Sequence, residues 1–348
     1  MKLSLMTLGD RLPDPVTGTT MTPKERYDML LDSAVLADAL GFHSINLGEH
    51  HGLGYELSAP PVVLGAIATQ TTQLRLSTAV ALLANLDAFR LAEDYATVDV
   101  ISNGRVDIVV GRGNFFASTY ELFGQSVDES RARFDENLDL LCRLWSGEET
   151  HWQGEFRPPI NGEPLMPKPL QQGTPPIWVG GGSSEDTARI TGQLGLKIML
   201  PSAFGPPEKF RGAVDVYLEA FSDAGHHHEP EIGASWHLNV AKTSQEARAR
   251  WEPRYRGYHA WTQDLLKKVN PNVPEFLLKG FDYEWLCASG PAVVGSPAEV
   301  AERLHKLGDM LGASLHLCYV DMGGLPAGEY LEMVQLLGDE VLPALADK

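Results

Sequence analysis

Short apolar runs rich in β-branched residues alternate along the chain with longer segments in which apolar residues recur at helical spacing. The short runs predict strands buried on both faces, which is typical of a parallel sheet covered by helices. The longer segments predict amphipathic helices. The predicted strands span residues 3–9, 44–48, 74–83, 106–111, 177–180, 197–200, 232–240 and 315–320.

Helix boundary signals separate these strands. Thr22 and Pro23 form an N-cap and first-turn pair, and Gly41 ends the helix that they begin. Asp87 is a second predicted N-cap. The predicted helices span residues 23–40, 60–71, 87–101, 128–145, 184–193, 207–224 and 296–311, followed by a C-terminal helix.

Eight strands, nearly all followed by a helix, favour an α/β fold of the (β/α)₈ TIM-barrel class over a doubly wound sheet, because the units form one continuous run. The whole chain, 1–348, is predicted to be a single domain with insertions at about 147–176 and 242–291. The second insertion is rich in aromatic residues, which favours a lid or a substrate wall. An insertion that packs its own aromatic residues, or a subunit interface, is the alternative.

Candidate chemistry lies at the carboxyl ends of the predicted strands, where barrel enzymes carry their active sites. The second strand runs directly into Glu49, His50 and His51. Two imidazoles and a carboxylate can act as acid and base or bind a metal, but a metal needs further ligands, and no HExxH or similar spacing is present. In the alternative interpretation one histidine faces the mouth while the other packs locally.

Two glycine-rich turns predict an anion site. The fourth strand ends at Arg112, which two glycines flank, and the fifth ends in three glycines before Ser183 and Ser184, where a helix begins. Free backbone N–H groups, the positive end of the helix dipole and two hydroxyls then converge on one place. Ordinary tight turns are the alternative. These residues together predict a barrel that binds a small phosphate-bearing ligand close to a histidine.

Charge and composition narrow the partners. The chain has 46 acidic and 28 basic residues, a formal charge of −18, which disfavours nucleic acid and anionic membrane surfaces. Three distant cysteines, no signal-like start and no long apolar run predict a cytoplasmic protein. The run His226-His227-His228 is most simply a solvated loop.

In their order along the chain, these strand ends resemble the luciferase-like (bacterial luciferase family) flavin-dependent monooxygenases and oxidoreductases. The likeness covers nearly the whole chain, and the ordered set of motifs is specific although no single motif is decisive. The matching motifs are Glu49-His50-His51, Thr78-Ala79-Val80, Ala92-Glu93-Asp94-Tyr95, Ile101-Ser102-Asn103-Gly104-Arg105, Gly111-Arg112-Gly113, Phe123-Gly124 leading to Ser130-Arg131, Pro176-Ile177-Trp178-Val179-Gly180-Gly181 with its serines, and Val294-Gly295-Ser296-Pro297.

The resemblance implies FMN bound at the C-terminal mouth of the barrel, over a non-proline cis peptide between Ala79 and Val80 in the third strand. His50 matches the family's mouth histidine, which assists the chemistry as an acid/base or hydrogen-bond donor. Gly111 stands where the light-emitting subunit has a reactive cysteine, so efficient light emission is not expected. The positions that match the family's phosphate ligands are Arg112, Arg131, Ser183, Ser184 and Thr187.

The function implied by the resemblance is that of a two-component monooxygenase. Reduced FMN would come from a separate NAD(P)H:flavin reductase, because the chain has no dinucleotide-binding fingerprint. Oxygen would add at the flavin C4a position, and the resulting peroxide would oxygenate a small, largely apolar organic substrate. The predicted substrate contacts are Phe115, Phe204, His237, Trp261 and Trp285.

Two other functions stay open. One is hydride transfer with the deazaflavin F420, on a similar fold and phosphate site; its long anionic tail suits a chain of charge −18 less well. The other is a flavin-binding subunit without turnover. A homodimer is expected from the resemblance and from the apolar faces of the early helices.

Overall fold

A parallel β-sheet forms the centre of the computed structural model, which describes residues 1–147, 149–181, 184–269 and 282–346. Within these residues, nine strands follow one path in the order β3-β2-β1-β12-β10-β9-β8-β5-β4, and β11 pairs with the far half of β10. The strands are β1 (Lys2–Thr7), β2 (Ser44–Leu47), β3 (Arg75–Thr78), β4 (Ala81–Leu82), β5 (Ile108–Gly111), β8 (Ile177–Gly180), β9 (Lys197–Leu200), β10 (Ile232–Val240), β11 (Ala292–Gly295) and β12 (Leu315–Tyr319).

The sheet closes on itself at the third predicted strand, which is divided into β3 and β4. These two short strands stand at opposite ends of the sheet path, so the path returns to its start. Asp107 N donates to Leu76 O at 3.0 Å. Two residues further along β3, the Thr78 side chain takes the place of a backbone bond between the strands. Its Oγ1 accepts from Val109 N at 3.0 Å and donates to Val109 O at 2.7 Å. The predicted TIM-like barrel is confirmed.

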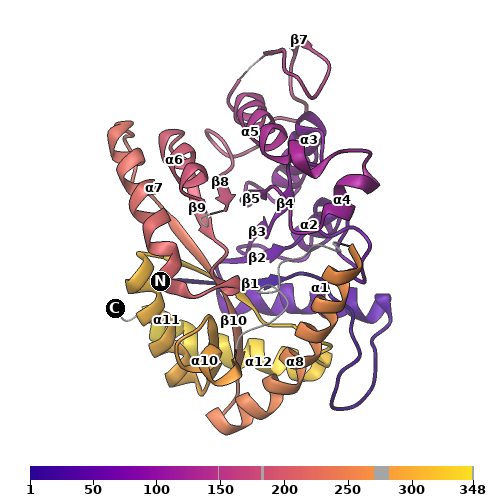
Figure 1. The fold of residues 1–348 in the computed structure, drawn as a ribbon, viewed down its shortest axis with the longest axis vertical. Coiled ribbons are helices and arrows are strands. Elements are labelled where there is room, and N and C mark those ends of the chain that lie inside the picture. The colour runs from indigo at the N-terminus through magenta and orange to yellow at the C-terminus, as the bar shows by residue number, and fades with distance from the viewer. Residues whose placement is uncertain (148, 182–183, 270–281, 347–348) are drawn as a thin grey trace.

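Helices follow the strands around the outside of the barrel (Figure 1). The predicted N-caps are confirmed, because Thr22 forms a capping box with Glu25 and Asp87 accepts from Arg90 N. The helices are α1 (Pro23–Leu40), α2 (Pro60–Ala68), α3 (Ala88–Ile101), α4 (Ala117–Leu122), α5 (Ser130–Ser146), α6 (Glu185–Gln193), α7 (Arg211–Asp223), α8 (Ser244–Val269), α10 (Tyr283–Ala288), α11 (Pro297–Leu311), α12 (Ala327–Leu336) and α13 (Leu342–Ala346).

The two insertions differ from the irregular stretches expected at residues 147–176 and 242–291. The first contains the antiparallel hairpin of β6 (Thr150–Trp152) and β7 (Ile160–Glu163), which protrudes beyond α3 and α5 in Figure 1. The second contains the 26-residue helix α8 and the short α10. Pro253 lies inside α8, and a proline there is a signal against a helix, so the sequence pattern did not predict this one.

Apolar side chains fill both faces of the sheet. Along β1, Leu3 and Leu5 point into the core between the sheet and the helices, whereas Met6 belongs to a second cluster inside the barrel. The second cluster continues into the aromatic side chains of α8, among them Trp251 and Tyr258. Helix α8 therefore packs on the barrel interior rather than on an outer surface.

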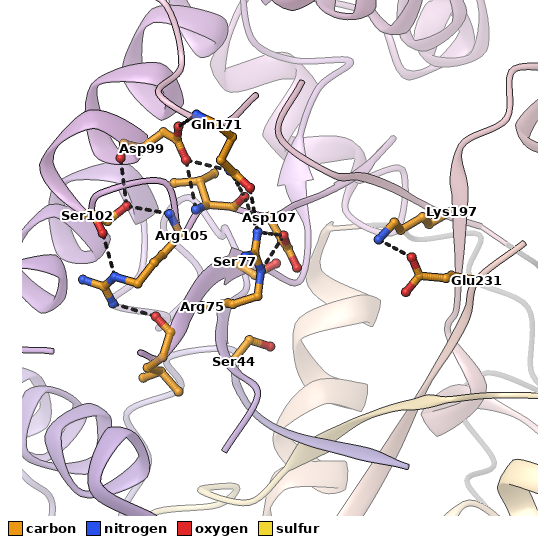
Figure 2. Close-up of polar contacts among 12 residues, drawn as sticks. Ser44, Arg75, Ser77, Asp99, Ser102, Arg105, Asp107, Gln171, Lys197 and Glu231 are labelled. Atoms are coloured by element: carbon orange, nitrogen blue, oxygen red, sulfur yellow. Dashed lines mark hydrogen bonds and ion pairs between the residues drawn. The ribbon is translucent and has the colours of Figure 1, made fainter. Parts of the chain in front are cut away.

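A group of polar side chains forms hydrogen bonds at the amino ends of the barrel strands (Figure 2). Asp99 of α3 accepts from Leu170 N at 2.7 Å and from Gln171 Nε2 at 2.7 Å, and Gln171 Oε1 accepts from Arg75 at 3.1 Å. These bonds hold the segment that leads from the hairpin back to β8.

In the described part of the chain, no helix has the length and apolar content that a membrane span needs.

Candidate active site

A cavity of about 390 Å³ opens at the carboxyl ends of the barrel strands. This is the end at which TIM barrels place their chemistry, and the volume lies in the range of small-ligand sites. Its walls are mostly apolar, and most of its charged or titratable groups, among them Glu49, His50 and Arg112, come from the turns that follow β2 and β5. The residues that line the cavity include Glu49, His50, Ala79, Val80, Arg112, Phe115, Ser184, Thr187 and Phe204.

His50 lines this cavity, and His51 does not. The His51 ring instead interacts with Glu49, with 2.8 Å between Nε2 and Oε1, and its face meets the edge of Phe123. The second Glu49 oxygen accepts from Leu82 N at 2.9 Å. Of the two interpretations of this motif, the one with a single histidine at the mouth agrees with the structure.

The His50 ring is a neutral imidazole at pH 7. Burial lowers the pKa of His50 from its usual 6.5 to about 4. Nδ1 lies 3.4 Å from Gly48 O, which favours the proton on Nδ1 and leaves Nε2 as an acceptor. A neutral imidazole of this kind can take up a proton or accept a hydrogen bond from a ligand in the cavity.

The peptide between Ala79 and Val80 is cis, as the resemblance implied, and both residues line the cavity. Glycines of neighbouring strands allow this close arrangement. A Cβ at Gly111 would lie 2.7 Å from a methyl carbon of Val80, and one at Gly48 would lie 2.8 Å from Ala79 O. Gly111 thus leaves no free room for a side chain unless Val80 moves.

One positive group and two hydroxyls of the predicted phosphate site line the same cavity. Arg112, Ser184 and Thr187 all line it, and Ser184 caps α6. Arg131 of α5 donates to Thr187 Oγ1 at 3.0 Å while it pairs with Asp135 at 2.8 Å. No hydrogen bond or ion pair occupies the Arg112 guanidinium among the residues that the structure describes.

This donor set fits the phosphate of a flavin mononucleotide. An unpaired guanidinium, two hydroxyls and the first turn of a helix are the groups that bind phosphate dianions. The structure therefore brings four of the five predicted phosphate residues together: Arg112, Arg131, Ser184 and Thr187. Ser183 lies outside the described residues.

The predicted substrate contacts divide into two groups. Phe115 and Phe204 line the cavity, whereas His237, Trp261 and Trp285 do not. The His237 ring packs 6.2 Å from the ring of Phe204, behind the wall, and Trp261 packs against Tyr55.

Several cavity residues escaped the sequence reasoning. Leu8 and Pro201 directly follow β1 and β9, so the rule that strand ends converge would have found them. Ser235 and Leu317 lie within β10 and β12, where the sequence pattern does not mark a cavity residue.

Other candidate groups lie away from the cavity. In the described ranges no set of three or more His, Cys, Asp or Glu side chains forms a metal-ligand cluster. His226 interacts through Nε2 with Gly192 O at 3.0 Å, at the end of α6. Cys142, Cys287 and Cys318 are not disulfide-bonded.

Comparisons with known proteins show the family to which the chain belongs. The model of the luciferase-like monooxygenase family matches residues 1–314, and the chain belongs to this family of enzymes. The oxygenase component of the flavin-dependent trigonelline monooxygenase of Acinetobacter baylyi is 27% identical over 361 residues, which cover 100% of this chain and 96% of that protein.

Two solved structures share the architecture. Monooxygenase RslO1 from Streptomyces bottropensis has a TM-score of 0.85 at 28% identity, covering 99% of this chain and 100% of its own. The oxygenating constituent of 3,6-diketocamphane monooxygenase from Pseudomonas putida, in complex with FMN, has a TM-score of 0.80 at 20% identity, covering 99% and 98%. At that identity the second likeness supports the fold alone.

Proposed function

We propose that this monooxygenase uses reduced FMN and oxygen, as the oxygenase component of a two-component system, to oxygenate a small, largely apolar organic molecule. The observation that carries the proposal is a single cavity lined by Arg112, by Ser184 at the start of α6 and by His50. The similarity to a flavin-dependent oxygenase component supports it. A separate reductase would supply the reduced flavin.

The phosphate end of the site would bind the cofactor. Arg112, Ser184 and Thr187 face the cavity directly, and Arg131 holds the Thr187 hydroxyl. The flavin ring would then lie over Ala79 and Val80, toward His50. When bound, the flavin supplies the oxygen-activating chemistry, and the protein supplies orientation and shielding from water.

His50 would hold or move a proton beside the reacting edge of the ring. The neighbouring Glu49 does not hold a proton on His50, because one of its oxygens pairs with His51 and the other accepts from Leu82 N. Apolar side chains such as Phe115, Phe204 and Leu317 would surround an apolar substrate. They would also exclude water from the site, as oxygen chemistry requires.

Rapid mixing of the protein and reduced FMN with oxygenated buffer tests this function. A transient flavin–oxygen adduct with its own absorbance, longer-lived than in free solution, is the expected result. Reoxidation at the rate of free reduced FMN, with and without candidate apolar ketones and aldehydes, would contradict the proposal.

Hydride transfer with F420 is the second candidate, because the fold accommodates a phosphate-bearing deazaflavin in the same way. The overall charge of −18 disfavours binding of its long anionic tail. Parallel titrations with FMN and F420 distinguish the two, and tighter binding of F420 would reverse the assignment.

A homodimer formed through α2 and α3 is part of the proposal. A groove of about 630 Å³ on these helices is lined by apolar residues that include Val62 and Ile101 and by charged residues such as Arg90 and Asp94, and Val62 is 73% exposed. Exposed apolar patches of this kind mark protein interfaces. Light scattering should give a dimer for the wild type and a monomer for Val62→Asp; a monomeric wild type would contradict this part.

A further inference from the structure

The loop that carries His50 has an unusual backbone. Gly52, Leu53 and Gly54 have φ values of +67°, +63° and +83°, so three successive residues are left-handed. Leucine in this region costs about 1–2 kcal/mol relative to its ordinary conformations. The surrounding structure must therefore hold the loop in place.

Helix α8 of the second insertion packs directly on this loop. A Cβ at Gly54 would lie 3.0 Å from the Trp261 ring, so the helix touches the loop backbone there. The Trp261 ring meets the Tyr55 ring edge-on at 5.0 Å. The Tyr55 and Tyr258 hydroxyls share a hydrogen bond of 3.2 Å.

Tyr258 is itself fixed to the barrel. Its ring packs edge-on against the ring of Tyr319 of β12, with 5.8 Å between the ring centroids. The Tyr319 hydroxyl donates to Asp10, and the other Asp10 oxygen accepts from Gly323 N at 3.0 Å. All four side chains from Tyr55 to Asp10 are buried, so these contacts lie within packed surroundings and not on the surface.

This series of side-chain contacts, from Asp10 through Tyr319, Tyr258 and Tyr55, ends at the His50 ring. The imidazole stacks on the Tyr55 ring with a centroid distance of 4.0 Å and an angle of 21°. The hydrogen bond of His50 itself is long, at 3.4 Å to Gly48 O. The ring face of Tyr55 thus sets the plane of the imidazole more firmly than that bond does.

We propose that Tyr55 and Tyr258 are positioning residues, through which the insertion helix α8 fixes the orientation of His50 in the cavity. The inference rests on the proposed function, because His50 has its catalytic role there. Tyr55 acts by stacking, and Tyr258 acts by holding the Tyr55 hydroxyl. Neither residue lines the cavity, so neither is expected to bind the cofactor.

The test observes His50 directly by ¹⁵N NMR of protein labelled at histidine, with His50→Gln to assign its signals. In the wild type we expect one tautomer and protonation far below pH 6.5, since burial lowers the pKa of His50 to about 4. Tyr55→Leu should give mixed tautomers and a higher pKa, and Tyr258→Phe a smaller change in the same direction. Tyr217→Phe is the control, because its buried hydroxyl donates to Leu196 O at 3.0 Å beside the amino end of β9.

Unchanged His50 signals in folded Tyr55→Leu would overturn the proposal. If that variant does not fold, Tyr258→Phe decides, because it keeps the ring and removes one hydroxyl; signals identical to those of the wild type would overturn it equally. In turnover, kcat should fall about tenfold in Tyr55→Leu, within the contribution of a positioned acid/base group, while the FMN dissociation constant stays unchanged. Shifted His50 signals together with full turnover of His50→Ala would instead contradict the proposed function and leave the positioning role intact.

Discussion

His50 and His51 are adjacent in sequence, and their surroundings separate their roles. His51 pairs with Glu49, with 2.8 Å between Nε2 and Oε1, so these two side chains orient each other. His50 instead stacks on Tyr55 and lines the cavity. A burial-depressed pKa of about 4 keeps His50 neutral at pH 7, so it can accept a proton from a ligand group beside it.

Replacement of His50 by alanine should therefore reduce turnover while binding persists. A positioned acid/base group contributes about 10²–10⁴-fold, and we expect a loss in that range with an FMN dissociation constant changed by less than about threefold. Steady-state kinetics and calorimetry measure the two quantities. Turnover equal to that of the wild type would remove His50 from the mechanism, and the absence of turnover in the wild type itself would favour a flavin-binding subunit.

The segment between α3 and β5 shows how an element that matches a family motif serves the fold. Arg105 is buried and donates to Ser102 O at 2.7 Å, Leu74 O at 2.6 Å and Ala68 O at 2.9 Å, so it ties the end of α2 to the start of β3. These contacts lie at the amino end of the strands, opposite the cavity.

Arg105→Lys should accordingly lower stability without changing the site. A lysine cannot reach all of these carbonyls, and several buried acceptors would lose their donor at a cost of about 1–3 kcal/mol each. We expect the free energy of unfolding to fall by about 3 kcal/mol or more by this reasoning. Arg90→Lys, whose side chain is 72% exposed, should change it by less than about 0.5 kcal/mol. Denaturant titration of both variants checks this, and equal effects would contradict it.

Helices and strands were predictable from the sequence where capping residues and the spacing of apolar residues indicate the same element. The eight barrel strands, the caps at Thr22 and Asp87 and the start of α6 at Ser184 were all predictable from apolar runs and capping residues. Helix α8 was not predicted, because Pro253 and the buried Arg254 interrupt its apolar face, although Trp251, Tyr255 and Tyr258 recur on that face at helical spacing.

The candidate site was predictable as far as strand ends and glycine turns define it. The distinction between His50 and His51, and the position of Trp261 against Gly54 rather than in the cavity, depend on tertiary packing. No local pattern encodes such contacts, since they join residues about 200 positions apart, as in the hydrogen bond of Tyr55 with Tyr258.

At the scale of the whole molecule, buried titratable groups make stability depend on pH. Burial lowers the pKa of four histidines, His43, His50, His237 and His316, from 6.5 to about 4. Between these values the unfolded chain binds protons that the folded protein does not, so the free energy of unfolding falls as the pH falls from 6.5 to 4. Burial also raises the pKa of Asp10 to about 6, which has the opposite sign and offsets part of this loss.

His316→Asn should therefore lose less stability between pH 7 and pH 5 than the wild type does. His316 Nδ1 accepts from Trp236 Nε1 at 3.0 Å, and an asparagine oxygen can take over as acceptor without titrating. Urea unfolding at the two pH values measures the difference, which we expect to be on the order of 1–2 kcal/mol. The same pH-dependent loss in both proteins would contradict the assignment.

Because the overall charge is −18, a positive group in the cavity matters for the binding of a phosphate. A strongly acidic protein repels phosphate groups over most of its surface, so a small pocket with Arg112 and the start of α6 provides local attraction. The ring and the phosphate of a flavin nucleotide would then occupy different ends of one cavity.

Calorimetric titration of the wild type and Arg112→Met with FMN and with riboflavin tests this central claim most directly. Riboflavin has the same ring without the phosphate. We expect Arg112→Met to weaken FMN binding about 10- to 100-fold, since a hydrogen bond to a charged group contributes about 1.5–3 kcal/mol, and to leave riboflavin binding unchanged. An equal loss for both ligands, or no loss for FMN, would contradict the account.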